Sequence, residues 1–304
     1  MGKIALVFSG QGAQYPGMGK GLYESSAAAR EVYEMADGVR PGTSAQCFTG
    51  TQEELNTTIN TQPCVFTADL AAAKAVVERG IYPDCVAGFS LGEIAAIGFA
   101  GMLSERDAFE LVCRRAQLMN DAAEQNKGAM AAVLKLESAK VEELCGRFEE
   151  AWPVNYNCPK QTVAAASEDV IDDLCAAVKA EGGKAVRLAV SGAFHSPYMA
   201  SAAKGLREYL KEKQLREPNV PVYANATAQP YGEDAKELLC RQCASPVLWQ
   251  ETIEHMAANG VDTFIEVGVG KTLMGLVKKT LPKASVYKVE TKEDLDAVAA
   301  ALEK

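Results

Sequence analysis

The stretch DCVAGFSLGEIAAIGFAG, residues 84–101, carries the pattern that decides the fold. Residues 84–88 are a short apolar run that predicts a buried strand, and residues 91–101 predict a helix. Between them, Gly88-Phe89-Ser90-Leu91-Gly92 fits the pattern G-x-S-x-G, which suits a sharp turn from strand to helix. This order of strand, turn and helix indicates an α/β domain with a mainly parallel sheet.

Similar elements flank this stretch on both sides. Residues 4–8 predict a second buried strand, and Pro63 is expected to open an alanine-rich helix that Gly80 ends. Ser104 is expected to cap a helix running to about Gln125, with Asp107 placed as in a capping box. Later in the chain, helices are expected at 199–213, 234–242, 247–258, from 272, and at the end, with strands at 220–224, 263–267 and 286–289.

The middle of the chain has a different pattern. Strands are expected at 129–136, 153–157, 162–166 and 185–190, with helices at 138–150 and 168–181. This β-α-β-β-α-β order is ferredoxin-like. Because α/β elements resume after it, we expect an inserted ferredoxin-like α+β subdomain at 127–192, within a larger α/β domain made of residues 1–126 and 193–304.

Composition limits the classes of function. The 304 residues are 48% hydrophobic and 23% charged, which is ordinary for a globular enzyme. The net charge of −9 works against nucleic-acid binding, which needs a basic footprint, so no nucleic-acid partner is expected. No apolar run approaches membrane-spanning length, and no membrane partner is expected.

The cysteines and the N-terminus bear on the compartment. Nine scattered cysteines are a poor disulfide framework and favour reduced thiols in a cytoplasmic setting. Cys240 and Cys243 are spaced C-x-x-C but lack a second pair, and we interpret them as incidental. The N-terminal apolar run is too short for a signal peptide.

Ser90 is the first candidate for chemistry. A strand-to-helix turn exposes a serine oxygen, and small flanking residues let a substrate approach, which is the geometry a nucleophile needs. The alternative is a tight turn with a capping serine.

A serine nucleophile needs a base, and the chain has two histidines. His255 lies off the apolar stripe of its predicted helix, so it is expected to be solvated. His195 lies in the predicted loop SGAFHSP, residues 191–197, a typical place for catalytic groups. His195 is therefore the candidate base, chosen by elimination, and a surface histidine is the alternative.

Arg115 and a glycine-rich loop are further candidates. Arg115 falls on the apolar stripe of its helix, whereas Arg114 points away from it. A buried guanidinium needs an anionic partner, either a structural acid, which the helical spacing slightly favours, or a ligand carboxylate. The loop GQGAQ, residues 10–14, lets backbone N–H groups approach an oxyanion, or is an ordinary glycine-rich exit from a strand.

Together and in this order, these segments resemble the malonyl-CoA:acyl carrier protein transacylase family over essentially the whole chain. The resemblance rests on the following motifs: FSGQGAQYPGMG (8–19), GFSLGE (88–93), RRAQLM (114–119), SGAFHSPYM (191–199), VYANATA (222–228), QCASPVLWQETI (242–253) and IEVGVGKTL (265–273).

The resemblance implies a hydrolase-like α/β domain with a ferredoxin-like insert, and a role for each matching residue. Ser90 would be the nucleophile and His195 the base, oriented by a main-chain carbonyl near Gln242. Backbone N–H groups of Gln11 and Leu91 would form the oxyanion hole, and Arg115 would hold the malonyl carboxylate. Three further residues match pocket positions: Gln62, Met119 and Gln242.

The implied reaction is a ping-pong transfer of malonyl from malonyl-CoA, through Ser90, to the phosphopantetheine thiol of holo acyl carrier protein, for fatty acid synthesis. No cofactor or metal is implied, because malonyl-CoA is a substrate. A serine hydrolase and a non-catalytic acyl-binding protein are the competing interpretations; Arg115 argues against the first, and the presence of both Ser90 and His195 argues against the second.

Two features stand apart from the main pattern. Phe89 occupies a position where the family usually has histidine, so polar contacts around the acyl carboxylate are expected to differ.

A run without acidic residues, 267–289, carries Lys271, Lys278, Lys279, Lys283 and Lys288. These lysines are either a docking patch for the acidic carrier protein or for coenzyme A phosphates, or a solvated surface, and the second interpretation is preferred.

Overall fold

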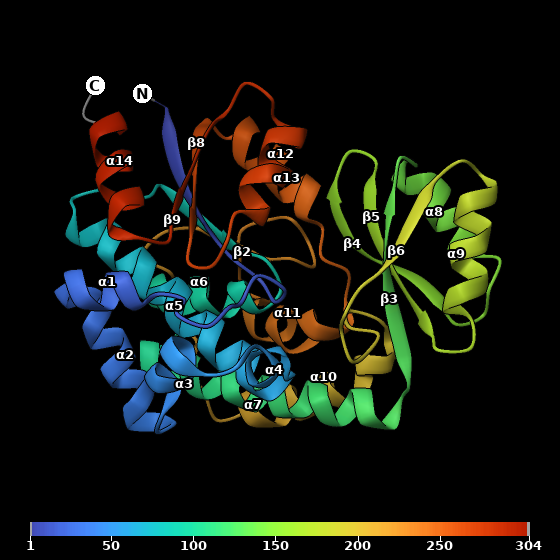
Figure 1. Cartoon of the computed structure of the whole chain (residues 1–304), viewed down its shortest axis with the longest axis horizontal. Coiled ribbons are helices and arrows are strands. Elements are labelled where there is room, and N and C mark those ends of the chain that lie inside the picture. The colour runs from blue at the N-terminus through green and yellow to red at the C-terminus, as the bar shows by residue number, and fades with distance from the viewer. Residues whose placement is uncertain (1, 303–304) are drawn as a thin grey trace.

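The computed structural model describes residues 2–302 and contains two bodies side by side (Figure 1). The larger body is built on a parallel sheet with strand order β7-β2-β1-β8-β9. Its strands are β1 (Lys3–Phe8), β2 (Cys85–Gly88), β7 (Val222–Tyr223), β8 (Val261–Val267) and β9 (Ser285–Val289). Mixed α/β architecture with a mainly parallel sheet is thus confirmed.

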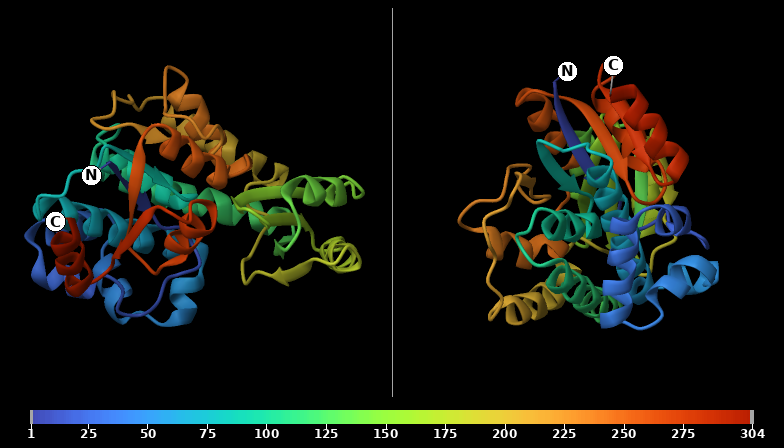
Figure 2. Two further views of the ribbon diagram at one scale, coloured as in Figure 1. Left: turned by 90° about the horizontal axis from the view of Figure 1, so that it is seen from above. Right: turned by 90° about the vertical axis from the view of Figure 1, so that its left-hand side faces the viewer.

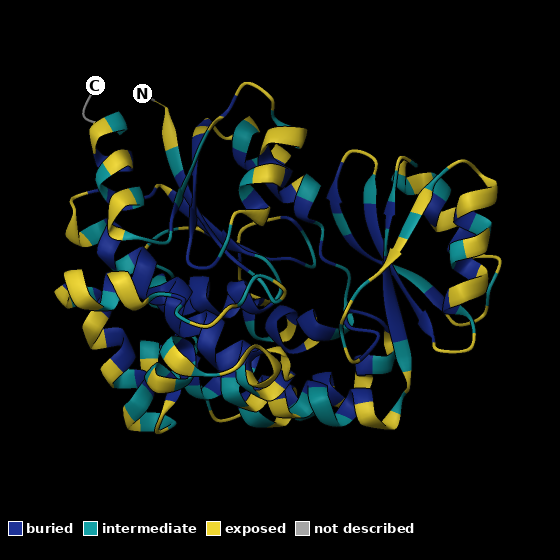
Figure 3. Cartoon of the chain, in the orientation of Figure 1, coloured by how far each residue is buried: buried dark blue, intermediate teal, exposed yellow. Residues whose placement is uncertain are grey.

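Helices cover both faces of this sheet, so most of β1 is buried (Figure 3). Leu6 and Phe8 face the core that contains α5 (Thr58–Glu78) and α6 (Leu91–Phe99). Ala5 and Val7 face the core that contains α12 (Trp249–Ala258) and α13 (Thr272–Thr280). Successive side chains of a strand point to opposite faces, which explains the continuous apolar run.

The remaining helices of the larger body lie around this framework (Figure 2). Four of them occupy residues 20–56, for which the sequence predicted no element: α1 (Lys20–Ser25), α2 (Ala27–Val39), α3 (Thr43–Thr49) and α4 (Gln52–Asn56). The others are α7 (Glu105–Gln125), α10 (Ala200–Leu210), α11 (Ala235–Arg241) and α14 (Lys292–Leu302). Within residues 2–302, no helix combines the length and apolar character needed to cross a membrane.

The smaller body has an antiparallel sheet with strand order β4-β5-β3-β6. Its elements follow the predicted sequence: β3 (Gly128–Leu134), α8 (Ser138–Cys145), β4 (Ala151–Cys158), β5 (Gln161–Ser167), α9 (Ile171–Ala180) and β6 (Lys184–Arg187). Ala131 and Val133 share a core with α8 and α9, whereas Met130 faces the core of the larger body. The sheet therefore has a helix-covered face and a face turned toward the larger body.

Main-chain hydrogen bonds join the two bodies. The Tyr156 N–H donates to the carbonyl of Val247 at 2.9 Å, and the Val247 N–H donates to the carbonyl of Val154 at 2.8 Å. This short parallel bridge attaches β4 to the segment that precedes α12.

Several predicted boundaries are wrong. Pro63 lies inside α5, which begins at Thr58. A proline near a helix start removes one early hydrogen bond, because it has no N–H to donate. The carbonyl that would have accepted this bond belongs to Ile59, a surface residue. Helix α8 ends at Cys145, because the chain turns at Gly146 to enter β4. Strand β7 is shorter than expected, since its pairing with β2 extends over two residues, Val86 and Ala87.

The cap of α7 is also only half as predicted. Ser104 accepts a hydrogen bond from the Asp107 N–H at 3.0 Å. The Asp107 carboxylate accepts from the Ser104 hydroxyl and from Lys213, and not from the Ser104 backbone N–H as in a capping box.

Two glycines allow the turn between β2 and α6 to pack against β1. A Cβ built on Gly92 would lie 2.3 Å from the carbonyl oxygen of Ser9 and 2.4 Å from that of Phe8. A Cβ on Gly88 would lie 1.9 Å from the backbone of Gly92. The pattern G-x-S-x-G is therefore a packing requirement at both of its glycines.

We expect Gly92→Ala to lower the free energy of unfolding by about 3 kcal/mol, because the methyl group would push α6 away from rigid backbone. Urea unfolding measures the change. The matched control is Gly21→Ala in α1, where the added methyl meets open space; it should change stability by less than about 1 kcal/mol. Equal stability of Gly92→Ala and wild type would contradict the tight approach.

Candidate active site

The candidate site lies where three parallel strands of the larger sheet end. Ser9 and Gln11 follow β1, Ser90 follows β2, and the segment from Gly268 follows β8. Ligands of open α/β sheets bind beyond the carboxyl ends of the strands, because loops there converge from several strands. The inward face of the smaller sheet closes this region from the other side, and residues of both bodies line it.

Ser90 and His195 are brought into direct contact. Ser90 Oγ lies 2.7 Å from His195 Nε2. His195 Nδ1 lies 3.1 Å from the carbonyl oxygens of both Gln242 and Ser245. Carbonyl oxygens only accept, so Nδ1 carries the proton and Nε2 is free to accept the proton of Ser90. The histidine is thus oriented by main-chain carbonyls rather than by a carboxylate.

Both residues have unusual backbone conformations. Ser90 has φ 55° and ψ −107°, and His195 has φ 62°. Positive φ angles are costly for residues with a Cβ and persist only where surrounding contacts hold them. The His195 N–H donates to the carbonyl of Cys243 at 3.0 Å, and the hydroxyl of Ser196 donates to Ala193 at 2.6 Å, which fixes the histidine loop.

Arg115 reaches the same point from α7, with 1% of its surface exposed. Its Nη1 donates to Gln62 Oε1 at 2.7 Å, and its Nη2 donates to Gln242 Oε1 at 2.9 Å and lies 3.2 Å from Ser90 Oγ. None of these partners carries a charge. The expected structural acid does not fill this role, and the guanidinium presents a buried positive charge next to the serine. Arg114 is exposed, as its place on the helix predicts.

The glutamines that hold Arg115 are themselves fixed. Gln62 and Gln242 are each 1% exposed, and Gln62 Nε2 lies 3.5 Å from the sulfur of Met119. Gln242 Nε2 donates to the Ser90 carbonyl at 2.8 Å. The predicted pocket residues therefore meet around one guanidinium, although they come from three separate parts of the chain.

Two titratable groups of the site have strongly shifted pKa values. Burial, and then the charge of Arg115, lowers the pKa of His195 to about 4. Burial raises the pKa of Glu93, on α6 beneath Ser90, to about 7, against the lowering effect of the Tyr231 hydrogen bond. A lowered pKa keeps the His195 imidazole neutral, and so able to accept a proton, throughout the neutral and mildly acidic range.

Replacing Arg115 by glutamine should move the acid limb of Ser90 reactivity to higher pH. The substitution removes a positive charge that opposes protonation of His195, so the pKa of His195 rises and protonation blocks the base earlier on acidification. The rate of Ser90 labelling by a fluorophosphonate, followed from pH 4 to 8 where the proteins stay folded, measures the limb. The exposed Arg114→Gln is the control, and an unmoved limb in Arg115→Gln would refute the electrostatic coupling.

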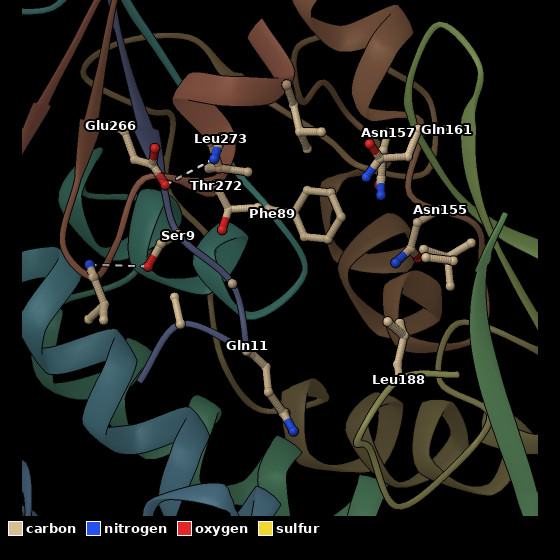
Figure 4. A pocket seen from close by; sticks show the side chains of 17 residues that line it. Ser9, Gln11, Phe89, Asn155, Asn157, Gln161, Leu188, Glu266, Thr272 and Leu273 are labelled. Carbon is tan, nitrogen blue, oxygen red and sulfur yellow. Dashed lines mark hydrogen bonds between the residues drawn. The ribbon is translucent and has the colours of Figure 1, made fainter. Parts of the chain in front are cut away.

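Two cavities lie next to each other at the candidate site. An inner chamber is lined by residues that include Ser90, Arg115, His195 and Met130. An outer cavity shares four residues with it, namely Gln11, Phe89, Asn155 and Leu188. Figure 4 shows this outer cavity, with Phe89 between the wall of Thr272 and Leu273 and the wall of Asn155, Asn157 and Gln161.

Phe89 contributes an apolar ring to the lining of both the inner chamber and the outer cavity. The ring packs edge-on against Trp249 with centroids 5.4 Å apart. Phenylalanine offers no hydrogen bond there, and the side chains that do lie within hydrogen-bond distance of Ser90 Oγ are those of His195 and Arg115.

Gln11 and Leu91, whose backbone N–H groups are the candidate oxyanion donors, both line the inner chamber. Leu91 is the first residue of α6, so its N–H has no acceptor within that helix. Gln11 lines the chamber from the loop after β1, and the Gly12 N–H donates to the Gln14 side chain at 2.8 Å, which holds this loop. Donors at a helix start and a strand exit are the usual components of an oxyanion hole.

Other predicted features lie outside the chamber. His255 is half-buried rather than solvated, with Nδ1 2.8 Å from the carbonyl of Ala228. Lys288 pairs with Glu290 at 3.2 Å, and Lys279 donates to Gln161, at the rim of the outer cavity, at 3.0 Å. Lys271 and Lys283 are exposed.

Sequence reasoning missed the polar residues that support Ser90 from below. Asn225 accepts from the Ser90 N–H at 2.8 Å, and Glu93 accepts from the Asn225 N–H at 3.2 Å. The available signal was a lone asparagine just after a predicted strand and a lone glutamate on an otherwise apolar helix.

Comparison with known proteins shows which family this chain belongs to. The family model described as acyl transferase domain matches residues 5–297. The malonyl CoA-acyl carrier protein transacylase of Bacillus subtilis (strain 168) is 39% identical, covering 97% of this chain and 96% of that protein. The malonyl CoA-acyl carrier protein transacylase of Clostridium perfringens has a crystal structure that superposes with a TM-score of 0.95 at 33% identity, covering 99% of this chain and 97% of that chain.

One solved structure also contains a partner. It is a complex of a type II PKS acyl-carrier protein with its malonyl-transacylase, and the transacylase superposes with a TM-score of 0.94 at 32% identity, covering 98% of this chain and 99% of that chain. Agreement of sequence and fold over nearly the full length of each protein shows that the chain belongs to the malonyl CoA-acyl carrier protein transacylase family of acyl transferases.

Proposed function

We propose that this protein transfers a malonyl group from malonyl-CoA to the phosphopantetheine thiol of holo acyl carrier protein, through an ester on Ser90, and so supplies extender units for fatty acid synthesis. One observation carries the proposal. Ser90 Oγ lies 2.7 Å from a neutral-imidazole nitrogen and 3.2 Å from an arginine that has only uncharged partners. A nucleophile beside an unneutralised cation suits an acyl group that carries its own carboxylate.

In the first half-reaction, Ser90 Oγ attacks the thioester carbonyl while His195 Nε2 accepts the hydroxyl proton. The negative charge moves to the carbonyl oxygen, where the N–H groups of Gln11 and Leu91 donate to it. The carbon–sulfur bond then breaks, and the coenzyme A sulfur takes the proton from His195. The malonyl group remains as an ester on Ser90.

The second half-reaction runs the same steps in reverse. His195 Nε2 accepts the thiol proton of the carrier protein, and the sulfur attacks the ester carbonyl. The same two N–H groups hold the oxyanion, the carbon–oxygen bond breaks, and the proton returns to Ser90 Oγ. Each step uses only these residues and the two substrates, so no cofactor is required.

Arg115 provides selectivity for malonyl over acetyl in this proposal. Its two terminal nitrogens are oriented by Gln62 and Gln242, so the guanidinium is held ready before an acyl group arrives. A malonyl carboxylate would neutralise this buried charge, whereas an acetyl group would leave it unpaired.

The outer cavity is the proposed site for the pantetheine arm. Asn155 and Asn157 line it, are nearly buried, and have carbonyl oxygens without a hydrogen-bond partner within residues 2–302. Pantetheine carries amide N–H donors that suit such acceptors, and a buried acceptor without a partner is costly unless a ligand fills it.

Support also exists for the finer description of the fold. The strand order β4-β5-β3-β6, entirely antiparallel and with α8 and α9 sharing one core with the sheet, suits an inserted ferredoxin-like subdomain at 127–192. The parallel sheet with a serine turn after β2 suits a hydrolase-like domain formed by residues 1–126 and 193–304. Nine free cysteines suit a reducing, cytoplasmic setting.

Steady-state kinetics with malonyl-CoA and holo acyl carrier protein test the proposal. Parallel lines in double-reciprocal plots, with malonyl carrier protein as the product, are expected for a ping-pong transfer. The competing hydrolase would release free malonate at a rate independent of the carrier protein, and this result would overturn the proposal.

A further inference from the structure

The turn that presents Ser90 is spanned by one side-chain amide. Asn225 Oδ1 accepts from the Ser90 N–H at 2.8 Å, and Asn225 Nδ2 donates to the carbonyl of Gly88 at 2.6 Å. These two main-chain groups flank Phe89, at the point where the strand β2 becomes the helix α6. A residue in the conformation of Ser90 needs such external support, because its positive φ is unfavourable by itself.

Asn225 is held in turn by Glu93. The Asn225 N–H donates to Glu93 Oε1 at 3.2 Å, and the Tyr231 hydroxyl donates to the same oxygen at 2.5 Å. Glu93 is completely buried on α6, one turn beyond Ser90. The contacts therefore form a closed ring that runs from Ser90 to Asn225, to Glu93, and back along the helix to Ser90.

Gln242 connects this ring to the rest of the site. Its Nε2 donates to the Ser90 carbonyl at 2.8 Å and to Asn225 Oδ1 at 3.3 Å. Its Oε1 accepts from Arg115, and its main-chain carbonyl lies 3.1 Å from His195 Nδ1. A shift of Asn225 would therefore displace Ser90 directly and, through Gln242, would displace His195 and Arg115.

We propose that Asn225 and Glu93 are positioning residues for the nucleophile: the Asn225 amide holds the Ser90 turn against β2, and the Glu93 carboxylate fixes Asn225. This proposal rests on the proposed role of Ser90 as nucleophile, and not on the identity of the acyl group. Their contribution is to the orientation of Ser90 Oγ toward His195 and of the Leu91 N–H toward the chamber. Misplacement of reacting groups by about 1 Å lowers rates by about 10²-fold.

Labelling of Ser90 by a fluorophosphonate tests the proposal without any malonyl substrate. Ser90 Oγ displaces fluoride at phosphorus and His195 takes the proton, so the maximal labelling rate reports the alignment of the two residues, separately from the affinity for the reagent. We expect Asn225→Ala to lower this maximal rate by about 10²-fold with little change in reagent affinity. Asn225→Asp has the same shape but sets an oxygen in place of the Nδ2 donor against the Gly88 carbonyl, so it should also label at least about tenfold more slowly than wild type.

Glu93 offers an independent pair of variants. Glu93→Gln keeps an acceptor for Asn225 and Tyr231, and it should label within about threefold of wild type, whereas Glu93→Ala should be slower by about tenfold or more. The control for stability alone is Val76→Ala, which removes buried atoms of α5 outside the site and should leave the maximal rate of the folded protein unchanged.

The outcomes separate the possibilities. Wild-type labelling rates in folded Asn225→Ala and Glu93→Ala would overturn the proposal, as would a wild-type rate in folded Asn225→Asp. If Asn225→Ala does not fold, the comparison of Glu93→Gln with Glu93→Ala decides. Wild-type protein that labels at Ser90 but accepts no malonyl group would refute the proposed function, while the same variants would still decide the positioning role.

Discussion

Replacement of His195 by alanine is expected to slow malonyl loading by about 10⁴-fold or more, because it removes the group that is positioned to accept the Ser90 proton at the moment of attack. His195 Nε2 is 2.7 Å from Ser90 Oγ, and two carbonyl oxygens keep its other nitrogen protonated. Rapid-quench measurement of a single turnover with malonyl-CoA gives the loading rate directly, without contributions from the carrier protein.

The second histidine provides the matched control. His255 lies on α12 and contacts the carbonyl of Ala228, away from the inner chamber. His255→Ala should load malonyl within about threefold of wild type. Loading by His195→Ala at more than about a tenth of the wild-type rate would show that another base serves Ser90.

Replacement of Arg115 by methionine is the second change expected to have a large effect. Methionine keeps the length of the aliphatic stem but leaves a malonyl carboxylate buried without a partner, which costs about 2–5 kcal/mol. We therefore expect kcat/KM for malonyl-CoA to fall by about 10²- to 10³-fold. The value for acetyl-CoA should rise, because the buried guanidinium no longer lies unpaired beside a methyl group.

The ratio of the two kcat/KM values is the decisive quantity. Arg115 also lies 3.2 Å from Ser90 Oγ, so its loss affects the nucleophile with both substrates, and this common effect cancels in the ratio. Arg114→Met, on the exposed side of the same helix, should leave the ratio unchanged. An equal fall of kcat/KM for malonyl-CoA and acetyl-CoA in Arg115→Met would show that the arginine supports Ser90 and does not bind the malonyl carboxylate.

The sequence was sufficient for elements that are encoded locally. The strand β2, the turn at Ser90 and the helix α6 follow from contiguous apolar runs and two glycines, and the structure shows why those glycines are needed. Helices α1, α3 and α4 were missed because they have only 6, 7 and 5 residues, too few to show an amphipathic period. Helix α2 is different: a cap at Ser26 and a buried stripe at helical spacing were present in its sequence and were overlooked. The predicted start of α5 at Pro63 was also wrong. Proline is a local signal for a helix start, but the helix begins five residues earlier, at Thr58.

Less of the site than of the fold could be predicted from the sequence, because the contacts of the site join residues that are far apart in the chain. Spacing alone left Arg115 open between a structural acid and a ligand, and the resemblance was needed to bring Gln62 and Gln242 to it. Asn225 had no recognised role, because the two groups it bonds, in Gly88 and Ser90, lie far from it in the sequence. Such partners become visible only when strands β2 and β7 are placed side by side.

The most direct test of the central claim is the intact mass of the protein after mixing with malonyl-CoA, with Ser90→Ala treated in parallel, followed by addition of holo acyl carrier protein. We predict a single malonyl adduct on the wild-type chain, none on Ser90→Ala, and loss of the adduct as the carrier protein gains the same mass. Free malonate with an unloaded carrier protein, or an equal adduct on Ser90→Ala, would contradict transfer through Ser90.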